Sequence, residues 1–182
     1  NVRTGEPARP YILIDAKNGE ILLRYDGLTF ADGTGPGGNQ KTGQYRYGPG
    51  AQRPPLEVTA LGRNKCALSN ASLRTENLNE GVTDIGSPFS FKCFENTVKP
   101  INGAFSPLND AHYFGSIIFA MWTNWYGTAP VARGLVFRVH YGRKYANAYW
   151  SGLAMYFGDG DDTHYPTVAL DIASHEVAHG YT

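Results

Sequence analysis

Three residues near the C-terminal end of the sequence have the types and spacing of a catalytic metal centre. His175 and His179 are four residues apart, so on a helix they share one face, with Cβ atoms about 5–6 Å apart. Two imidazoles at this spacing can bind one ion at the roughly 2.0–2.1 Å of a zinc–nitrogen bond. Glu176 is rotated by about 100° from His175, so it can flank the metal without binding it. Its carboxylate could then accept a proton from a water molecule that the metal activates, which predicts hydrolysis at neutral pH.

The alternative is a chance H-E-x-x-H on an amphipathic helix. Ile172, Val177 and Ala178 surround the motif with apolar side chains. In such a setting two unliganded histidines would be costly to bury, because their polar rings would lose hydrogen bonds to water. We therefore interpret the two histidines as metal ligands.

Several elements must position this motif. A helix is expected from about residue 167, after strands over residues 135–141 and 147–157. The acidic turn at residues 158–162 could bind calcium, but it lacks the twelve-residue loop pattern and the distal Glu, so a solvated turn is expected. A long helix should begin after the N-cap Ser106, with Pro107 in its first turn, and end at Gly127. Its apolar stripe is expected to pack on a sheet as core and consists of Tyr113, Phe114, Ile117, Ile118, Met121, Trp122 and Trp125.

The first hundred residues read as short strands and turns. Residues 10–25 form a predicted hairpin around Asn18-Gly19. The Gly/Pro-rich stretch from 26 to 50 is expected to hold no regular element and to mark a boundary. Residues 56–104 show short runs typical of antiparallel strands, separated by Asn, Ser and Gly.

Composition narrows the class of protein. Lys plus Arg and Asp plus Glu both number 16, and this zero net charge argues against nucleic acid or an anionic membrane as main partner. With 42% hydrophobic residues the chain can build a core. There is no starting Met or signal peptide, so we expect the chain to begin, and also to end, inside a larger precursor. Cys66 and Cys93 could be two buried thiols or one disulfide.

Longer motifs resemble a known family. The runs Asn147-Ala148-Tyr149-Trp150, Phe157-Gly158-Asp159-Gly160 and His175-Glu176-Val177-Ala178-His179 resemble the thermolysin family of zinc peptidases. The runs Gly35-Pro36-Gly37-Gly38-Asn39-Gln40-Lys41-Thr42-Gly43 and Ser106-Pro107-Leu108-Asn109-Asp110-Ala111-His112 are similar to its pseudolysin/vibriolysin branch. The resemblance extends from about Ala31 to Thr182.

The resemblance implies roles for individual residues. His175 and His179 would be the zinc ligands and Glu176 the catalytic base. Asn147 and Ala148 would bind the substrate backbone, with Trp150 nearby, and this suits an edge strand that pairs with an extended peptide. Ile172 would line a pocket for bulky hydrophobic residues, although simple core packing explains it equally well. Asp171 would hold calcium, or would only favour the helix N-terminal turn. Cys66 and Cys93 would form the disulfide of the branch.

The resemblance also divides the chain. Residues 1–30 would be the end of an inhibitory pro-segment, with the maturation cut near Phe30–Ala31, unless the hairpin belongs to the mature fold. Residues 31–182 would be the N-terminal part of the catalytic domain, truncated after the HExxH motif. In the family the third zinc ligand is a Glu about twenty residues past the second His, followed later by a His that stabilises the oxyanion. Thr182 is only three residues beyond His179, so both are expected to be missing and the chain alone to be inactive.

The fold expected is α+β: a twisted antiparallel β-sheet lobe with a long packing helix and a zinc-binding HExxH helix. The function expected is that of a secreted zinc-dependent neutral endopeptidase, made as a zymogen, that cuts on the N-terminal side of bulky hydrophobic residues. It would be exported via the periplasm in a Gram-negative-type source and use Zn²⁺, with Ca²⁺ in the complete enzyme. Its partners would be peptide substrates, its own pro-segment and its missing C-terminal half, and it would be a monomer. Two alternatives remain: a non-catalytic fragment, or an inactive homologue that acts as a peptide-binding module.

Overall fold

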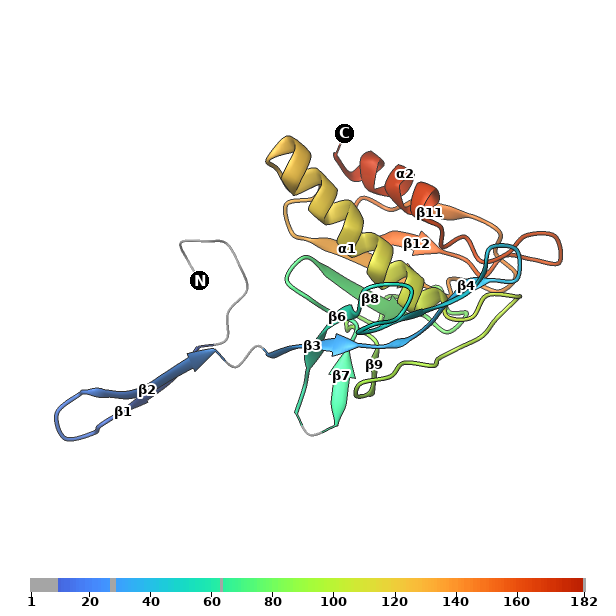
Figure 1. The fold of residues 1–182 in the computed structure, drawn as a ribbon. Coiled ribbons are helices and arrows are strands. Elements are labelled where there is room, and N and C mark those ends of the chain that lie inside the picture. The colour runs from blue at the N-terminus through green and yellow to red at the C-terminus, as the bar shows by residue number, and fades with distance from the viewer. Residues whose placement is uncertain (1–9, 27–28, 63, 182) are drawn as a thin grey trace.

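Within the residues that the structure describes, two four-stranded sheets and two helices form the body of the protein (Figure 1). The computed structural model describes residues 10–26, 29–62 and 64–181. The first sheet has the order β3 (Thr29–Gly33), β6 (Leu56–Ala60), β7 (Lys65–Ala67) and β9 (Ser90–Lys92). The second has the order β11 (Ala148–Trp150), β12 (Met155–Phe157), β10 (Leu135–Val139) and β8 (Leu73–Asn77). Among the described residues, no helix has the length and apolar character needed to cross a membrane.

The helices α1 (Pro107–Tyr126) and α2 (Leu170–Tyr181) lie side by side on the second sheet (Figure 1). Helix α1 packs on β8 and β10, and α2 packs on β11. The α+β class is therefore confirmed. The first sheet is antiparallel as predicted, whereas β10 pairs in parallel with both β8 and β12, and only β11–β12 is antiparallel. A parallel pair needs a crossover connection, which α1 provides between β8 and β10.

The N-terminal hairpin is confirmed. Strands β1 (Pro10–Ile14) and β2 (Ile21–Asp26) pair in antiparallel register around a turn in which Gly19 has φ +74°. Figure 1 shows the hairpin extending away from the body. Five of its apolar side chains are about half exposed: Ile12, Leu13, Ile14, Ile21 and Leu22. The boundary near residue 30 remains a prediction, and β3 runs through it; residues 1–9 and 27–28 lie outside the described residues.

The expectation that residues 26–50 hold no regular element is wrong. Besides β3, this stretch contains the hairpin β4 (Gly35–Asn39) and β5 (Gly43–Tyr47). Gly37 has a packing role there, because a Cβ on it would lie 2.4 Å from Asp110 Oδ1 and 2.5 Å from the Tyr45 ring. Glycine at this position permits a close approach of the strand to the helix. A high content of glycine and proline does not distinguish such a strand from a loop.

Asp110 fastens this hairpin to the first turn of α1. Its carboxylate accepts hydrogen bonds from Gly38 N at 3.0 Å, Tyr45 Oη at 2.9 Å and Tyr47 Oη at 2.7 Å. Burial raises the pKa of the Asp110 carboxyl above its ordinary value, and the hydrogen bonds from Tyr47 and Gly38 oppose that rise. The anchor is a buried polar group whose hydrogen bonds are satisfied across three elements.

Helix α1 has the predicted ends but a different buried face. Ser106 Oγ accepts from Asn109 N, and the N–H of Gly127 donates to Thr123 O at 3.1 Å. In the predicted stripe Ile118 is buried, whereas Ile117 is 37% exposed and Trp125 is 73% exposed. The interpretation of that stripe as core is therefore wrong toward the C-terminal end of the helix. The buried residues at i, i+3, i+7 and i+10 are Leu108, Ala111, Gly115 and Ile118.

Two further strand and helix boundaries differ from expectation. The single strand predicted over residues 147–157 is wrong, because the chain turns between β11 and β12, where Gly152 has φ +89°. Helix α2 begins at Leu170 rather than near residue 167, since Thr167 instead hydrogen-bonds through its backbone N–H to Gly158 O.

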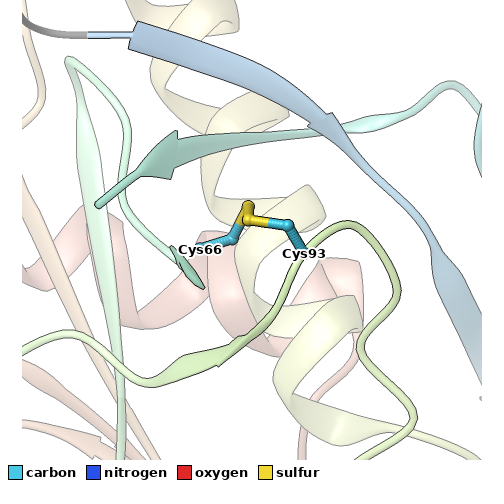
Figure 2. The surroundings of a disulfide bond; sticks show 2 residues. All are labelled: Cys66 and Cys93. Atoms are coloured by element: carbon cyan, nitrogen blue, oxygen red, sulfur yellow. A yellow bond between two sulfur atoms is a disulfide. The ribbon is translucent and has the colours of Figure 1, made fainter. Parts of the chain in front are cut away.

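The disulfide between Cys66 and Cys93 is present, with Cα atoms 5.1 Å apart (Figure 2). It joins β7 to the residue that follows β9 and lies beside the core, where Cys66 is fully buried. Closing a loop across a separation of 27 residues stabilises the fold by roughly 3 kcal/mol on chain-entropy grounds.

A buried histidine links α1 to both sheets. His112 Nε2 lies 2.7 Å from Glu57 O, and Nδ1 lies 3.0 Å from Thr75 Oγ1. A carbonyl can only accept, so Nε2 carries the proton and Nδ1 accepts from the threonine hydroxyl. Burial lowers the pKa of His112 to about 4.

We predict an acid-dependent loss of stability from His112. The folded state resists protonation of this ring, because the pKa of His112 is about 4 in the folded state and 6.5 in the unfolded chain. The stabilisation from the neutral ring is therefore complete above pH 6.5. As the pH falls toward 4, the free energy of unfolding should decrease by about 3 kcal/mol. Urea unfolding at pH 7 and pH 4.5 measures this. His112→Gln should reduce the difference between the two values, whereas His164→Gln, at an exposed loop histidine, should preserve it. An unchanged difference in His112→Gln would contradict the assignment.

Candidate metal centre

Helix α2 presents two histidines to solvent because its other face is packed. Ala173 and Val177, four residues apart, are fully buried in the main core. His175 and His179 lie on the exposed side, which contradicts the expectation that an apolar environment surrounds them. Neither ring therefore bears a cost of burial, and the metal interpretation depends instead on the mutual geometry of the two rings.

That geometry fits one shared ion. The Nε2 atoms of His175 and His179 are 3.1 Å apart, and the ring planes are nearly perpendicular at 89°. Two nitrogens bound to zinc at 2.0–2.1 Å with a tetrahedral angle would be about 3.3 Å apart. Glu176 follows His175 in the helix and is only 7% exposed. The residues present suit two ligands and one base.

A complete ligand set is not found within the described residues. No group of three or more His, Cys, Asp or Glu side chains among them could hold a metal ion. A catalytic zinc takes three protein ligands and keeps one open position. The described part of the chain therefore offers two ligands of the three.

The predicted peptide-binding residues lie at the edge of the second sheet. Strand β11 is the edge strand, with Ala148 opposite Phe157 of β12. Asn147 is exposed, and its carbonyl accepts from Gly158 N at 3.1 Å, which fixes the entry into the strand. The other side of β11 has no strand partner among the described residues, so an extended peptide could pair there.

Trp150 connects this edge strand to the histidine helix. A Cβ on Gly180 would lie 3.3 Å from Trp150 Cζ2 and 3.0 Å from Val131 Cγ2. The missing side chain lets α2 approach β11 closely, one residue after His179. The helix that carries the two histidines and the edge strand are thus in direct contact.

Two other predicted residues have modest environments. Ile172 is half-buried and packs against the main core, which supports its packing role, while its pocket role remains a prediction. Asp171 is exposed in the first turn of α2, and its Oδ1 accepts from Ile172 N at 2.9 Å. Calcium binding by Asp171 also remains a prediction.

The acidic turn before α2 is not simply solvated. Asp159 is 5% exposed, and its Oδ1 lies 2.6 Å from His140 Nδ1. Asn102 Nδ2 donates to the carbonyls of Asp159, Asp161 and His164 at 2.7–3.1 Å. Sequence reasoning missed Asn102 and His140, since neither belongs to a motif. Together they hold the loop that leads into the histidine helix.

A family model and several known proteins are similar to this chain. The model of the family described as thermolysin metallopeptidase, catalytic domain, matches residues 40–182. A neutral protease of Vibrio proteolyticus is 48% identical and a virulence metalloprotease of Vibrio anguillarum 47% identical, each over 100% of this chain and 30% of the relative. A zinc metalloproteinase, MspA, of Legionella longbeachae is 35% identical over 97% of this chain and 36% of its own length. The chain thus spans about a third of the length of these relatives.

Among solved structures, the precursor of protealysin from Serratia proteamaculans is similar over 60% of this chain and 34% of its own. It is 23% identical in sequence, and the TM-score is 0.48.

We predict that the histidine pair binds one Zn²⁺ per chain. His175→Ala and His179→Ala should each weaken binding at least tenfold, because a single imidazole remains. Isothermal titration with zinc chloride measures this, and His164→Ala, at an exposed histidine away from α2, should leave the affinity unchanged. Equal affinity in all three variants would contradict the site.

Proposed function

Because this chain belongs to the thermolysin metallopeptidase family, we propose that it carries the zinc-binding part of a secreted, zinc-dependent neutral endopeptidase. One observation supports this most directly: the two Nε2 atoms are 3.1 Å apart on the exposed face of α2, and Glu176 is the residue after His175. A protease name is also attached to each of the similar Vibrio proteins, and a zinc metalloproteinase name to the Legionella protein.

The reaction proposed is hydrolysis of a peptide bond. His175 and His179 would hold the metal, which supplies Lewis acidity at the scissile carbonyl and lowers the pKa of water. Glu176 would take the proton from the attacking water and pass it to the leaving amine. Its low exposure suits this role, because a carboxylate held in place stays close to the reacting atoms.

The substrate would lie along β11. Asn147 and Ala148 would bind its backbone, with Trp150 beside it. The edge of β11 that has no strand partner among the described residues can donate and accept main-chain hydrogen bonds. A bulky hydrophobic residue after the scissile bond would fill a pocket bordered by Ile172. This preference rests on family likeness and on the half-buried position of Ile172.

The site would be completed from outside the described residues. A third ligand is needed, since the described residues offer only two, and so we propose that this chain alone is inactive. Asp171 would join a calcium site completed in the same way. Residues 1–30 would act as the end of a pro-segment, and the Cys66–Cys93 disulfide suits an extracellular protein.

A second candidate function is peptide binding without catalysis. The incomplete ligand set among the described residues favours it, because the edge strand could hold a peptide without a metal. Turnover by the zinc-loaded complete protein would exclude it.

Glu176→Gln should separate the two functions. In the protein expressed from its complete reading frame, loss of the base should lower kcat/KM for a peptide at least 100-fold while one Zn²⁺ stays bound. Peptide hydrolysis and metal content are measured on the same sample. Glu57→Gln, an exposed glutamate on β6, is the matched control and should retain activity. Full activity of Glu176→Gln at full zinc occupancy would exclude the base role.

A further inference from the structure

A cavity of about 630 Å³ opens at the end of β11, where the chain turns toward β12. Trp150 and Leu153 form the wall from this turn, and the segment 131–134 forms the wall ahead of β10. Arg74 of β8, Arg138 of β10 and the carboxylate Asp84 also line it, together with Val136 and Gly152. Of the residues that line this cavity, the proposed function uses Trp150 and gives the others no role.

The cavity adjoins the metal-binding helix. Val131 and Trp150, which both line it, are the two side chains closest to a Cβ on Gly180, the residue after His179. Trp150 is also the last residue of the edge strand. A peptide paired with β11 advances about 3.3 Å per residue, so the residue opposite Trp150 or its neighbour would lie at the cavity.

The charges around the cavity do not cancel. Arg138 Nε donates to Glu76 Oε2 at 2.9 Å, and its Nη2 contacts Asp84. Arg74 Nε donates to Glu76 Oε1 at 2.9 Å. Asp84, which lines the cavity, and Glu76, which does not, thus balance the charges of Arg74 and Arg138. The excess positive charge is on Arg133, which is exposed and has no ion-pair partner in the part of the chain that the structure describes.

We propose that this cavity is a substrate subsite for an acidic side chain, with Arg133 as its cationic ligand. The proposal rests on the peptidase function proposed above. A guanidinium group binds a carboxylate through two parallel N–H···O bonds. A glutamine side chain in the substrate would form this pair of bonds poorly, and a lysine side chain there would be repelled by the positive charge. The rings and aliphatic carbons of Trp150 and Leu153 would contact the methylene groups of the acidic residue.

The test is a substrate scan with the zinc-loaded protein expressed from its complete reading frame. The peptide substrates are identical except for one residue, which is Glu, Gln or Lys. This residue is placed in turn at each position from two to four residues on either side of the scissile bond. At one position kcat/KM should favour Glu over Gln by about three- to tenfold, and the ratio should fall as ionic strength rises. Arg133→Gln should bring that ratio close to one. Arg133→Glu should make the Lys peptide the preferred substrate at that position.

Arg143→Gln is the matched control. Arg143 is an exposed arginine that lines a different cavity and makes a 3.6 Å contact with Glu80, so the ratio should not change. Equal cleavage of the Glu, Gln and Lys peptides at every position would overturn the subsite and leave the peptidase function standing. An unchanged ratio in Arg133→Gln would also overturn it. If no peptide is cleaved at all, the proposed function fails and the subsite fails with it.

Discussion

The packing of helix α2 on the second sheet is the contact on which the candidate site depends. Ala173 and Val177 are fully buried, and their positions on the helix decide which residues face outward. Because the helical repeat is fixed, burying one face places His175 and His179 together on the other. Gly180 lets the same helix approach Trp150 and Val131 closely. Core packing and metal geometry are thus two results of one helix orientation.

Polar anchors hold the elements around that helix. Asp110 ties the β4–β5 hairpin to the start of α1, and His112 ties α1 to Thr75 of β8 and to the backbone of β6. Asn102 binds three carbonyls of the loop that precedes α2. Each anchor is a side chain that joins segments far apart in the sequence. Such hydrogen bonds fix relative positions better than apolar packing alone, since their geometry is directional.

Local features of this fold could be predicted from the sequence, whereas features that depend on distant partners could not. The spacing of His175 and His179, the N-cap Ser106 and the turn at Gly19 are set within a few residues, and the structure has all three as expected. Strand direction in the second sheet, the β4–β5 hairpin and the exposure of Trp125 depend on which segments meet in space. Gly37 illustrates the difficulty, because its role is visible only beside Asp110 and Tyr45. The roles of the site residues in metal and peptide binding remain predictions.

Strand β3 has a consequence for how this chain could be processed. Residues Phe30 and Ala31 both pair with β6, opposite Thr59 and Val58, and β3 is the outer strand of its sheet. The peptide bond between them is therefore already extended, with one backbone edge turned outward, which is the conformation in which a peptidase receives a strand. A cut there would leave Ala31, Asp32 and Gly33 hydrogen-bonded to the sheet. The new amino terminus would be the first residue of an ordered strand. The hairpin would no longer be covalently attached, but Thr29 and Phe30 would still pair with β6.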